Sequence, residues 1–179
     1  LAVQFIKAAF GIPTHTYGTG SDSPIMDGQC MSEGALRSML IGLSGADILG
    51  GAGQFEVATT ISPVQLAIDN EVFGMVRRML AHITFDDESL AWTDLLRAEP
   101  GGNFLTGDHT LRHCRDGLMP TNFTRMTRED WNKQGPGDLV ARAAQYCKDL
   151  LEKVTPANLP AQVTREMDAI VERADKQLG

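Results

Sequence analysis

Cysteine is scarce in this sequence. Its three cysteines, Cys30, Cys114 and Cys147, lie far apart and are odd in number. That usage favours free thiols in a reducing compartment over a framework of disulfides. The sequence also has no Cys-x-x-Cys pair that would supply zinc ligands. We therefore expect a cytoplasmic protein.

Long apolar runs and clusters of positive charge are also missing. No run reaches the roughly 18 apolar residues that read as a membrane span, and no basic segment precedes a short apolar one as in a signal peptide. Lys and Arg number 16 against 23 Asp and Glu, which gives a net charge of −7. Because the basic residues form no dense cluster, we expect neither nucleic acid nor a membrane as a partner.

What remains is the composition of an ordinary globular domain. The chain has 179 residues, of which 42% are hydrophobic and 22% charged, and one domain is the natural expectation. It is shorter than the roughly 250 residues of a complete (β/α)8 barrel. It also opens directly on a helical pattern, LAVQFIKAAF, so we expect a fragment of a longer protein.

Helical and strand patterns alternate in the first third of the chain. Short apolar, β-branched runs follow helical periodicities, and glycine-rich loops follow those runs, as in βα units with a parallel sheet. The expected elements are a helix over 3–10 ending at Gly11, a strand over 12–17, a loop over 18–27, a helix from Met31 to before Gly45, a strand over 46–49 and a loop over 50–54.

After residue 62 the sequence pattern predicts helices and no further strands. Ser62, Pro63 and Gln65 form a helix start of the capping-box type, with a buried stripe from Leu66 to Leu80. Further helix caps are expected at Asp86 or Asp87, Thr127 and Asp138, a helical turn near 109–115, an interruption at 156–160 and a last helix. We therefore divide one domain into strand-helix units (1–62) and a helical part (63–179).

Polar residues that follow the two expected strands are the candidate site. Reactive groups of a parallel barrel come from the loops at the carboxyl ends of its strands. Glu56 could meet a cation there, together with aromatic faces such as Tyr17 and Phe55, or could be a solvated loop carboxylate. Asp27 could instead be the N-cap of the next helix. The Gly-x-Gly pairs in both loops indicate tight turns at least as well as a phosphate cradle, because the full dinucleotide fingerprint is absent.

Four histidines are present, and two of them are spaced like metal ligands. His109 and His113 are four residues apart and would share a helix face. The sequence places no third ligand, although Asp108 and Cys114 are nearby. Structural or solvent-facing histidines are the favoured interpretation, and we expect no metal.

A set of short motifs also follows the chain in a fixed order. They are Tyr17-Gly18, Ser21-Asp22 and Asp27-Gly28-Gln29; Gly45-Ala46-Asp47 and Gly51-Ala52-Gly53; Ser62-x-x-Gln65-Leu66-x-x-Asp69-Asn70-Glu71; Pro100-Gly101-Gly102-Asn103-Phe104-Leu105 with His109-Thr110; and Trp131 with Gly135. The ordered set resembles the trimethylamine/glycine betaine methyltransferase family of corrinoid-dependent methyltransferases.

The resemblance implies the C-terminal part of a TIM (β/α)8 barrel followed by a helix-rich region. It implies transfer of a methyl group from a methylated amine, quaternary like glycine betaine or tertiary like trimethylamine, to a Co(I) corrinoid carried by a separate partner protein. Only ordinary residues stand over 18–24, which favours a member without pyrrolysine. We assign catalysis to Glu56 and His109. Substrate binding is assigned to Tyr17, Asp27, Gln29, Gln54 and Phe55.

Two other functions stay open. The piece could be a non-catalytic packing and assembly unit, or a divergent barrel with another small-molecule task. We expect it to be inactive alone, because a barrel needs its other strands. Open sheet edges must be covered, either by self-association or by an N-terminal half of the enzyme, and we expect a homo-oligomer.

Overall fold

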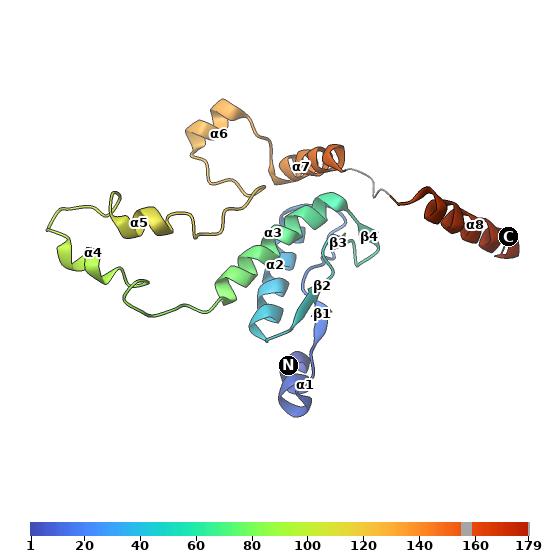
Figure 1. Cartoon of the computed structure of the whole chain (residues 1–179), viewed down its shortest axis with the longest axis horizontal. Coiled ribbons are helices and arrows are strands. Elements are labelled where there is room, and N and C mark those ends of the chain that lie inside the picture. The colour runs from blue at the N-terminus through green and yellow to red at the C-terminus, as the bar shows by residue number, and fades with distance from the viewer. Residues whose placement is uncertain (155–158, 179) are drawn as a thin grey trace. The chain divides into compact units, whose positions relative to one another are not determined.

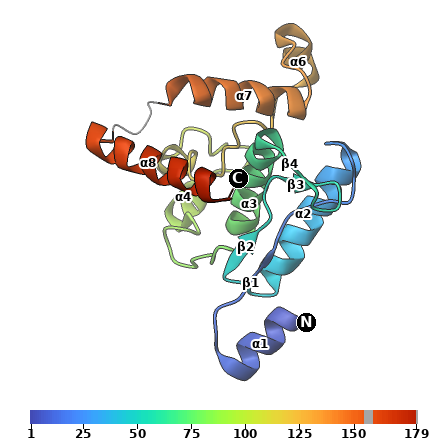
Figure 2. The ribbon, with the colours of Figure 1, turned by 90° about the vertical axis from the view of Figure 1, so that its right-hand side faces the viewer.

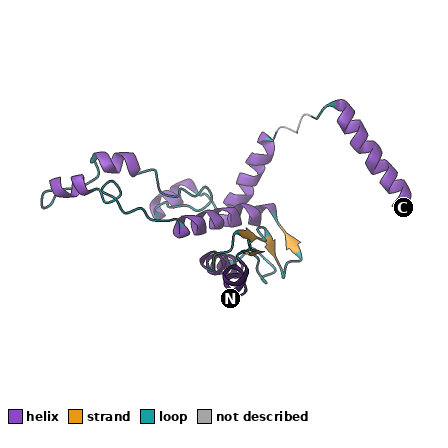
Figure 3. Ribbon diagram, turned by 60° about the horizontal axis from the view of Figure 1, so that its bottom comes forward, coloured by secondary structure: helices purple, strands orange, loops and turns teal. Residues whose placement is uncertain are grey.

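The structure is a computed structural model that describes residues 1–154 and 159–178 (Figure 1). The chain groups into two compact units, Leu1–Cys147 and Lys148–Gly179. Helix far outweighs strand, as the colouring in Figure 3 shows. Among the described residues, none of the helices has the length and apolar content needed to cross a bilayer. The expected boundary at residue 62 falls on the N-cap of the third helix.

Two parallel strands with a helix between them form the first part of the chain. Helix α1 (Ala2–Phe10) ends on a left-handed Gly11 with φ 63°, as expected. Strands β1 (His15–Tyr17) and β2 (Ile48–Gly50) pair in parallel, with Tyr17 opposite Gly50. Helix α2 (Gly28–Leu43) connects them. The predicted strand-helix alternation and the parallel pairing are therefore confirmed.

Both strands are shorter or shifted relative to the prediction. Residues 12–14 lie outside β1 because the carboxylate of Asp47 takes the backbone N–H of Thr14 at 2.8 Å and its hydroxyl at 3.2 Å. Asp47 also pairs with Lys7 of α1 at 2.7 Å. The Lys7 ammonium and the Thr14 amide, in that order, hold the pKa of Asp47 below its ordinary value. The carbonyl of Thr14 also accepts the backbone amides of Asp47 and Ile48 at 3.1 Å, so side-chain and backbone hydrogen bonds together hold this point.

A hairpin stands where the sequence predicted only a loop. Strands β3 (Gln54–Phe55) and β4 (Thr60–Ile61) pair antiparallel. Three consecutive residues at the tip, Glu56, Val57 and Ala58, have φ of 52°, 52° and 62°, in the left-handed region. Such angles are unusual for residues other than glycine, and most of all for a β-branched valine. The turn therefore lacks the Asn-Gly or Asp-Gly signal by which hairpins are predicted.

Helix α3 (Pro63–Leu80) packs along α2 (Figure 2). Ser62 caps it as predicted, accepting the amides of Val64 and Gln65 at 3.2 and 3.4 Å. The predicted apolar stripe is only partly correct, because Leu66 is 47% exposed and Leu80 40%. The face buried on α3 is half polar and consists of Gln65, Ile68, Asp69 and Val76.

The remaining helices follow along loops that contain little regular structure. Thr127 and Asp138 cap their helices as predicted, through the amides of Asp130 and Ala141. Asp86 caps a turn through the amide of Ser89 rather than a helix through Leu96. Pro156 in the predicted interruption lies outside the described residues. The helices are α4 (Trp92–Arg97), α5 (Asp108–His113), α6 (Arg128–Gln134), α7 (Leu139–Lys153) and α8 (Ala161–Leu178).

Candidate functional site

A pocket of about 280 Å³ lies at the carboxyl ends of the two parallel strands. It contains two residues predicted to bind substrate, Tyr17 and Gln54, and two charged side chains of opposite sign, Asp22 and Arg37. This is the place where parallel α/β proteins bind ligands. The rest of its lining is Thr19, Gly20, Ser21, Val57 and Ala58.

The ring of Tyr17 is largely exposed and lies against a glycine. The Tyr17 side chain is 57% exposed. Gly51 has φ +83°, and a Cβ there would come within 2.6 Å of Cδ1 of Tyr17 and 3.1 Å of the carbonyl oxygen of Thr19. Only glycine fits both the angle and the space. The second glycine-rich loop therefore packs directly against the ring of Tyr17. Of the two interpretations of its Gly-x-Gly spacing, a tight turn and a phosphate cradle, this packing favours the tight turn.

Glu33 of α2 fixes the loop that carries Asp22. Its Oε2 accepts the hydroxyl of Ser21 at 2.7 Å and the backbone N–H of Asp22 at 3.0 Å. These two hydrogen bonds, the hydroxyl first, lower the pKa of Glu33. Ser21 is buried, whereas the side chain of Asp22 is exposed on the pocket wall. Glu33 thus orders a loop of the site without lining the pocket.

Asp27 and Gln29 lie at the start of α2, where their polar atoms have local partners. Asp27 is the N-cap: its Oδ1 accepts the amide of Cys30 at 3.0 Å and the hydroxyl of Ser23 at 2.9 Å. These hydrogen bonds lower the pKa of Asp27, and the bond from the Cys30 amide has a larger effect than the bond from the Ser23 hydroxyl. The side chain of Gln29 donates to Glu33 at 2.9 Å. The capping role that we left open for Asp27 is confirmed; substrate binding by either residue stays a prediction.

Phe55 and Glu56 have opposite surroundings although they are neighbours. Phe55 is 8% exposed, so its ring belongs to the packing beneath the hairpin. Glu56 is exposed at the tip, and its carboxylate accepts the hydroxyl of Thr60. The backbone amides of Glu56 and Val57 donate to the carbonyls of Ser23 and Ser21 at 2.9 and 3.1 Å. Those bonds hold the left-handed tip against the first loop, and place Glu56 next to the pocket-lining Val57.

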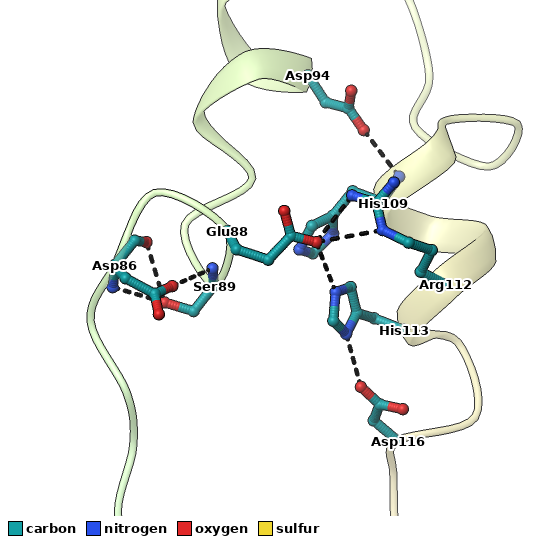
Figure 4. Close-up of polar contacts among 8 residues, drawn as sticks. All are labelled: Asp86, Glu88, Ser89, Asp94, His109, Arg112, His113 and Asp116. Atoms are coloured by element: carbon teal, nitrogen blue, oxygen red, sulfur yellow. Dashed lines mark hydrogen bonds and ion pairs between the residues drawn. The ribbon is translucent and has the colours of Figure 1, made fainter.

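His109 belongs to a second cluster, on α5 (Figure 4). Its backbone N–H donates to Asp94 at 3.3 Å, and its ring lies 4.4 Å from that of His113, centroid to centroid. Its Nε2 is buried and has no hydrogen-bond partner among the described residues. The partners of His109 and those of Glu56 have no residue in common, so the structure does not join the two predicted catalytic residues in one site.

Carboxylates surround His113 on both sides of its ring. Nδ1 lies 2.6 Å from Asp116 and Nε2 3.0 Å from Glu88 (Figure 4). These hydrogen bonds, Asp116 first, raise the pKa of His113. Glu88 also accepts a hydrogen bond from Nη2 of Arg112 at 2.8 Å. Both partners lower the pKa of Glu88, and His113 has the larger effect. One ligand atom from each of Glu88, His109 and His113 falls within 4.8 Å of the others, which is close enough for a shared cation.

Arg37 is the site residue that the sequence reasoning missed. It lies on α2 one turn after Glu33, next to the buried positions Gly34 and Ser38. The guanidinium approaches the first loop: a Cβ on Gly20 would come within 3.4 Å of its Nη1. A charged pair at i and i+4 on the flank of a buried helix face could have indicated it.

The comparisons with known proteins agree on one family. The sequence model described as trimethylamine methyltransferase (MTTB) matches residues 4–179. A trimethylamine methyltransferase MttB of Desulfitobacterium hafniense is 32% identical over 95% of this chain and 34% of its own length. An MttB of Methanosarcina barkeri is 32% identical over 98% of the chain and 35% of its own length.

A glycine betaine methyltransferase is also similar. The protein from Desulfitobacterium hafniense strain Y51 is 27% identical over 95% of the chain and 36% of its own length. The chain thus spans about a third of the length of the curated relatives it matches.

Proposed function

The chain belongs to the trimethylamine methyltransferase family, and from that membership we propose that it is part of an enzyme that moves a methyl group from a methylated amine to the Co(I) corrinoid of a separate partner protein. The observation that carries the proposal is the pocket at the carboxyl ends of β1 and β2. An aromatic face, a carboxylate and a guanidinium line it, and a barrel would carry its active site at the carboxyl ends of its strands.

We propose a TIM barrel for the whole enzyme. The unit β1–α2–β2 is a strand, a connecting helix and a parallel strand, the repeating element of that fold. Its two-stranded sheet has open edges, and α2 exposes three leucines on one side: Leu36, Leu40 and Leu43, at 62–67% exposure. Further strands and helices would cover both features. The two parallel strands found among the described residues are too few to close a barrel.

The pocket's charges favour a zwitterionic methylated amine. The ring of Tyr17 and the carboxylate of Asp22 would attract a quaternary ammonium. Arg37 would bind a carboxylate, for which its planar, doubly donating guanidinium is suited. Trimethylamine has no carboxylate, whereas glycine betaine has one. The relatives' names give two substrates, trimethylamine and glycine betaine. Of these two, glycine betaine matches the charges of this pocket better.

Tyr17, Asp22 and Arg37 would bind and orient the substrate without donating a proton. A quaternary ammonium departs as a neutral amine when it loses a methyl group, so no general acid is needed on the nitrogen. Glu56, exposed beside the pocket, adds negative charge at the rim that would favour the cationic end of the substrate. Gln54 supplies an amide in the wall. Residues from the other strands of the proposed barrel would complete the substrate pocket.

The corrinoid would approach from outside this pocket. A corrin macrocycle is larger than a 280 Å³ pocket, and none of the described residues that line the pocket is a histidine. The residues present therefore fit the amine and not the corrinoid, in keeping with a cofactor carried by a partner protein. The corrinoid, bound to that partner protein, would supply the nucleophile that accepts the methyl group.

A packing and assembly role is the second candidate for the chain taken alone. The open strand edges and exposed leucines favour self-association, and we propose that the isolated chain forms a homo-oligomer without activity. Light scattering should give a mass of at least twice 19.4 kDa; a monomer would remove the support for this role.

The free thiols of Cys30, Cys114 and Cys147 support a cytoplasmic protein.

The methyl transfer is tested with the full-length enzyme and cob(I)alamin. Methylcobalamin formation should be faster with glycine betaine than with trimethylamine. Arg37→Gln should raise KM for glycine betaine about 10-fold or more, as expected for a hydrogen bond between charged groups, and leave trimethylamine unchanged. Arg77→Gln on α3, outside the pocket, is the matched control. Methyl transfer from neither amine would refute the proposal, and equal effects of Arg37→Gln on both amines would refute the carboxylate role.

A further inference from the structure

The cluster on α5 has the composition and spacing of a metal site, which the sequence could not complete because it gave no third ligand. We infer that Glu88, His109 and His113 bind a divalent transition-metal ion, and that Zn²⁺ is the ion they fit best. Two imidazoles and one carboxylate form a recognised three-residue zinc set, with a fourth position for water.

The geometry allows this with small side-chain movements. The three ligand atoms lie within 4.8 Å of one another. Two ligands at about 2.1 Å from a tetrahedral zinc ion are about 3.4 Å apart, so each side chain has to move by about 1 Å. Nε2 of His113 and Oε1 of Glu88 are already 3.0 Å apart. His109 and His113 lie on one face of α5, one turn apart.

Two further observations point to a bound ion. Nε2 of His109 is buried without a hydrogen-bond partner among the described residues, although buried polar atoms are nearly always paired. A metal–nitrogen bond would supply that partner. On the far side of His113, Asp116 lies 2.6 Å from Nδ1. A carboxylate behind a ligating imidazole fixes the ring and makes it a stronger ligand.

The surroundings have room and negative charge for a cation. A cavity of about 150 Å³ adjoins the cluster and is lined by Glu88 and His109, with three further carboxylates from Asp87, Asp94 and Asp108. Arg112 competes with the ion, because its Nε and Nη2 both donate to Oε1 of Glu88. Binding would therefore use the other oxygen of Glu88 or displace the guanidinium.

The consequence would be structural. Glu88 precedes α4, whereas both histidines lie on α5, so an ion would link the two helices across a loop. All three residues lie outside the pocket of Tyr17 and Arg37. The site is therefore independent of the proposed methyl transfer, and either proposal can fail alone.

The test is metal binding by the full chain after dialysis against EDTA. Calorimetric titration should show one Zn²⁺ per chain, and Co²⁺ should give visible d–d absorption. Glu88→Gln, His109→Ala and His113→Ala should each weaken binding about 10-fold or more. Asp116→Asn should weaken it about 10- to 100-fold. Arg112→Gln should keep or strengthen it.

Matched controls separate this site from adventitious binding. His82→Ala and Cys114→Ser should bind Zn²⁺ like the unaltered chain. Glu88 is 57% exposed, so Glu88→Gln leaves the fold intact and remains decisive if a histidine variant fails to fold. Absence of saturable binding, normal binding by Glu88→Gln, or loss of binding in Cys114→Ser would each overturn the assignment.

Discussion

Asp69 of α3 accepts the backbone N–H of Gly53 at 2.7 Å through Oδ2, and so ties the helix to the loop after β2. Its other oxygen accepts the side-chain amide of Gln65 at 2.8 Å, and the carbonyl oxygen of that amide accepts the thiol of Cys30 at 3.6 Å. All three side chains are buried. The side chain of Gln65 belongs to this buried polar chain instead of forming the predicted capping-box bond back to Ser62, whose backbone N–H donates to Gly53 at 2.9 Å.

Asp69→Asn should destabilise the chain by about 1–3 kcal/mol, because an amide offers one acceptor oxygen where two buried donors need partners. Chemical unfolding measures the change. Ala67→Ser, a small polar change elsewhere on α3, is the control and should cost much less. An unchanged unfolding midpoint in Asp69→Asn would mean that the Gly53 bond carries no stability.

The same carboxyl predicts a pH dependence. Burial, the largest effect, raises the pKa of Asp69 above 3.8, against the opposing hydrogen bonds from Gly53 and Gln65. A raised pKa in the folded state means that stability is fully present below the unfolded pKa and is lost as the pH rises through the folded pKa. The stability advantage of the unaltered chain over Asp69→Asn should therefore shrink as the pH rises above 3.8. An advantage that grows over this range would contradict the effect of burial.

Substitutions at two glycines with the same φ can distinguish the cost of backbone strain from the cost of a steric clash. Gly45 and Gly51 both have φ +83°, but a Cβ meets nothing within 4 Å at Gly45 and lies 2.6 Å from the Tyr17 ring at Gly51. Gly45→Ala should cost only the left-handed penalty of about 1–2 kcal/mol. Gly51→Ala should cost about 1–3 kcal/mol more, for the displaced ring. Equal losses on thermal unfolding would show that the ring moves freely.

Glu71 should control the order of the loop before α6. Its Oε1 accepts the amides of Thr121 and Asn122 at 3.0 and 2.6 Å, and its Oε2 the amide of Phe123 at 3.2 Å. Glu71→Gln should release one or more of these amides, at a cost of about 1.5–3 kcal/mol, and speed hydrogen exchange over 121–123. The control is Glu129→Gln.

Glu129 forms an exposed pair with Lys133 at 2.6 Å. Pairs of this kind contribute about 0–1 kcal/mol. Hydrogen exchange over 121–123 should therefore be unaltered in Glu129→Gln, and an effect as large as that of Glu71→Gln would show that Glu71 has no special role.

The cap of α3 gives a further comparison between two variants. Ser62 accepts two amides at the start of the helix. Ser62→Ala should lower stability by about 1 kcal/mol, and Ser62→Asn, which retains an acceptor at this position, by much less. Denaturant unfolding distinguishes the two. Identical losses would mean that the side-chain cap does not stabilise α3.

Local chemistry in the sequence determined the features that depend on a few neighbouring residues. The caps at Asp27, Ser62, Thr127 and Asp138 were predictable, because a short acceptor side chain satisfies amides two or three residues ahead. The alternation of helix and strand and the parallel pairing followed from periodicity, and the family from motifs in order. Tyr17 and Gln54 could be placed in one pocket because strand ends gather at one edge of a sheet.

Tertiary structure alone decided the rest. The hairpin at Gln54–Ile61 depends on amides that donate to Ser21 and Ser23, more than 30 residues earlier. Arg37 reaches the pocket, and Glu88 reaches His113, only because separate segments meet in space. Periodicity reports which way a side chain points within its own element; it carries no information about which distant polar group will lie opposite. That is why the sequence identified the family and one wall of the site, whereas folding brought in Arg37 and brought Glu88 close to the two histidines.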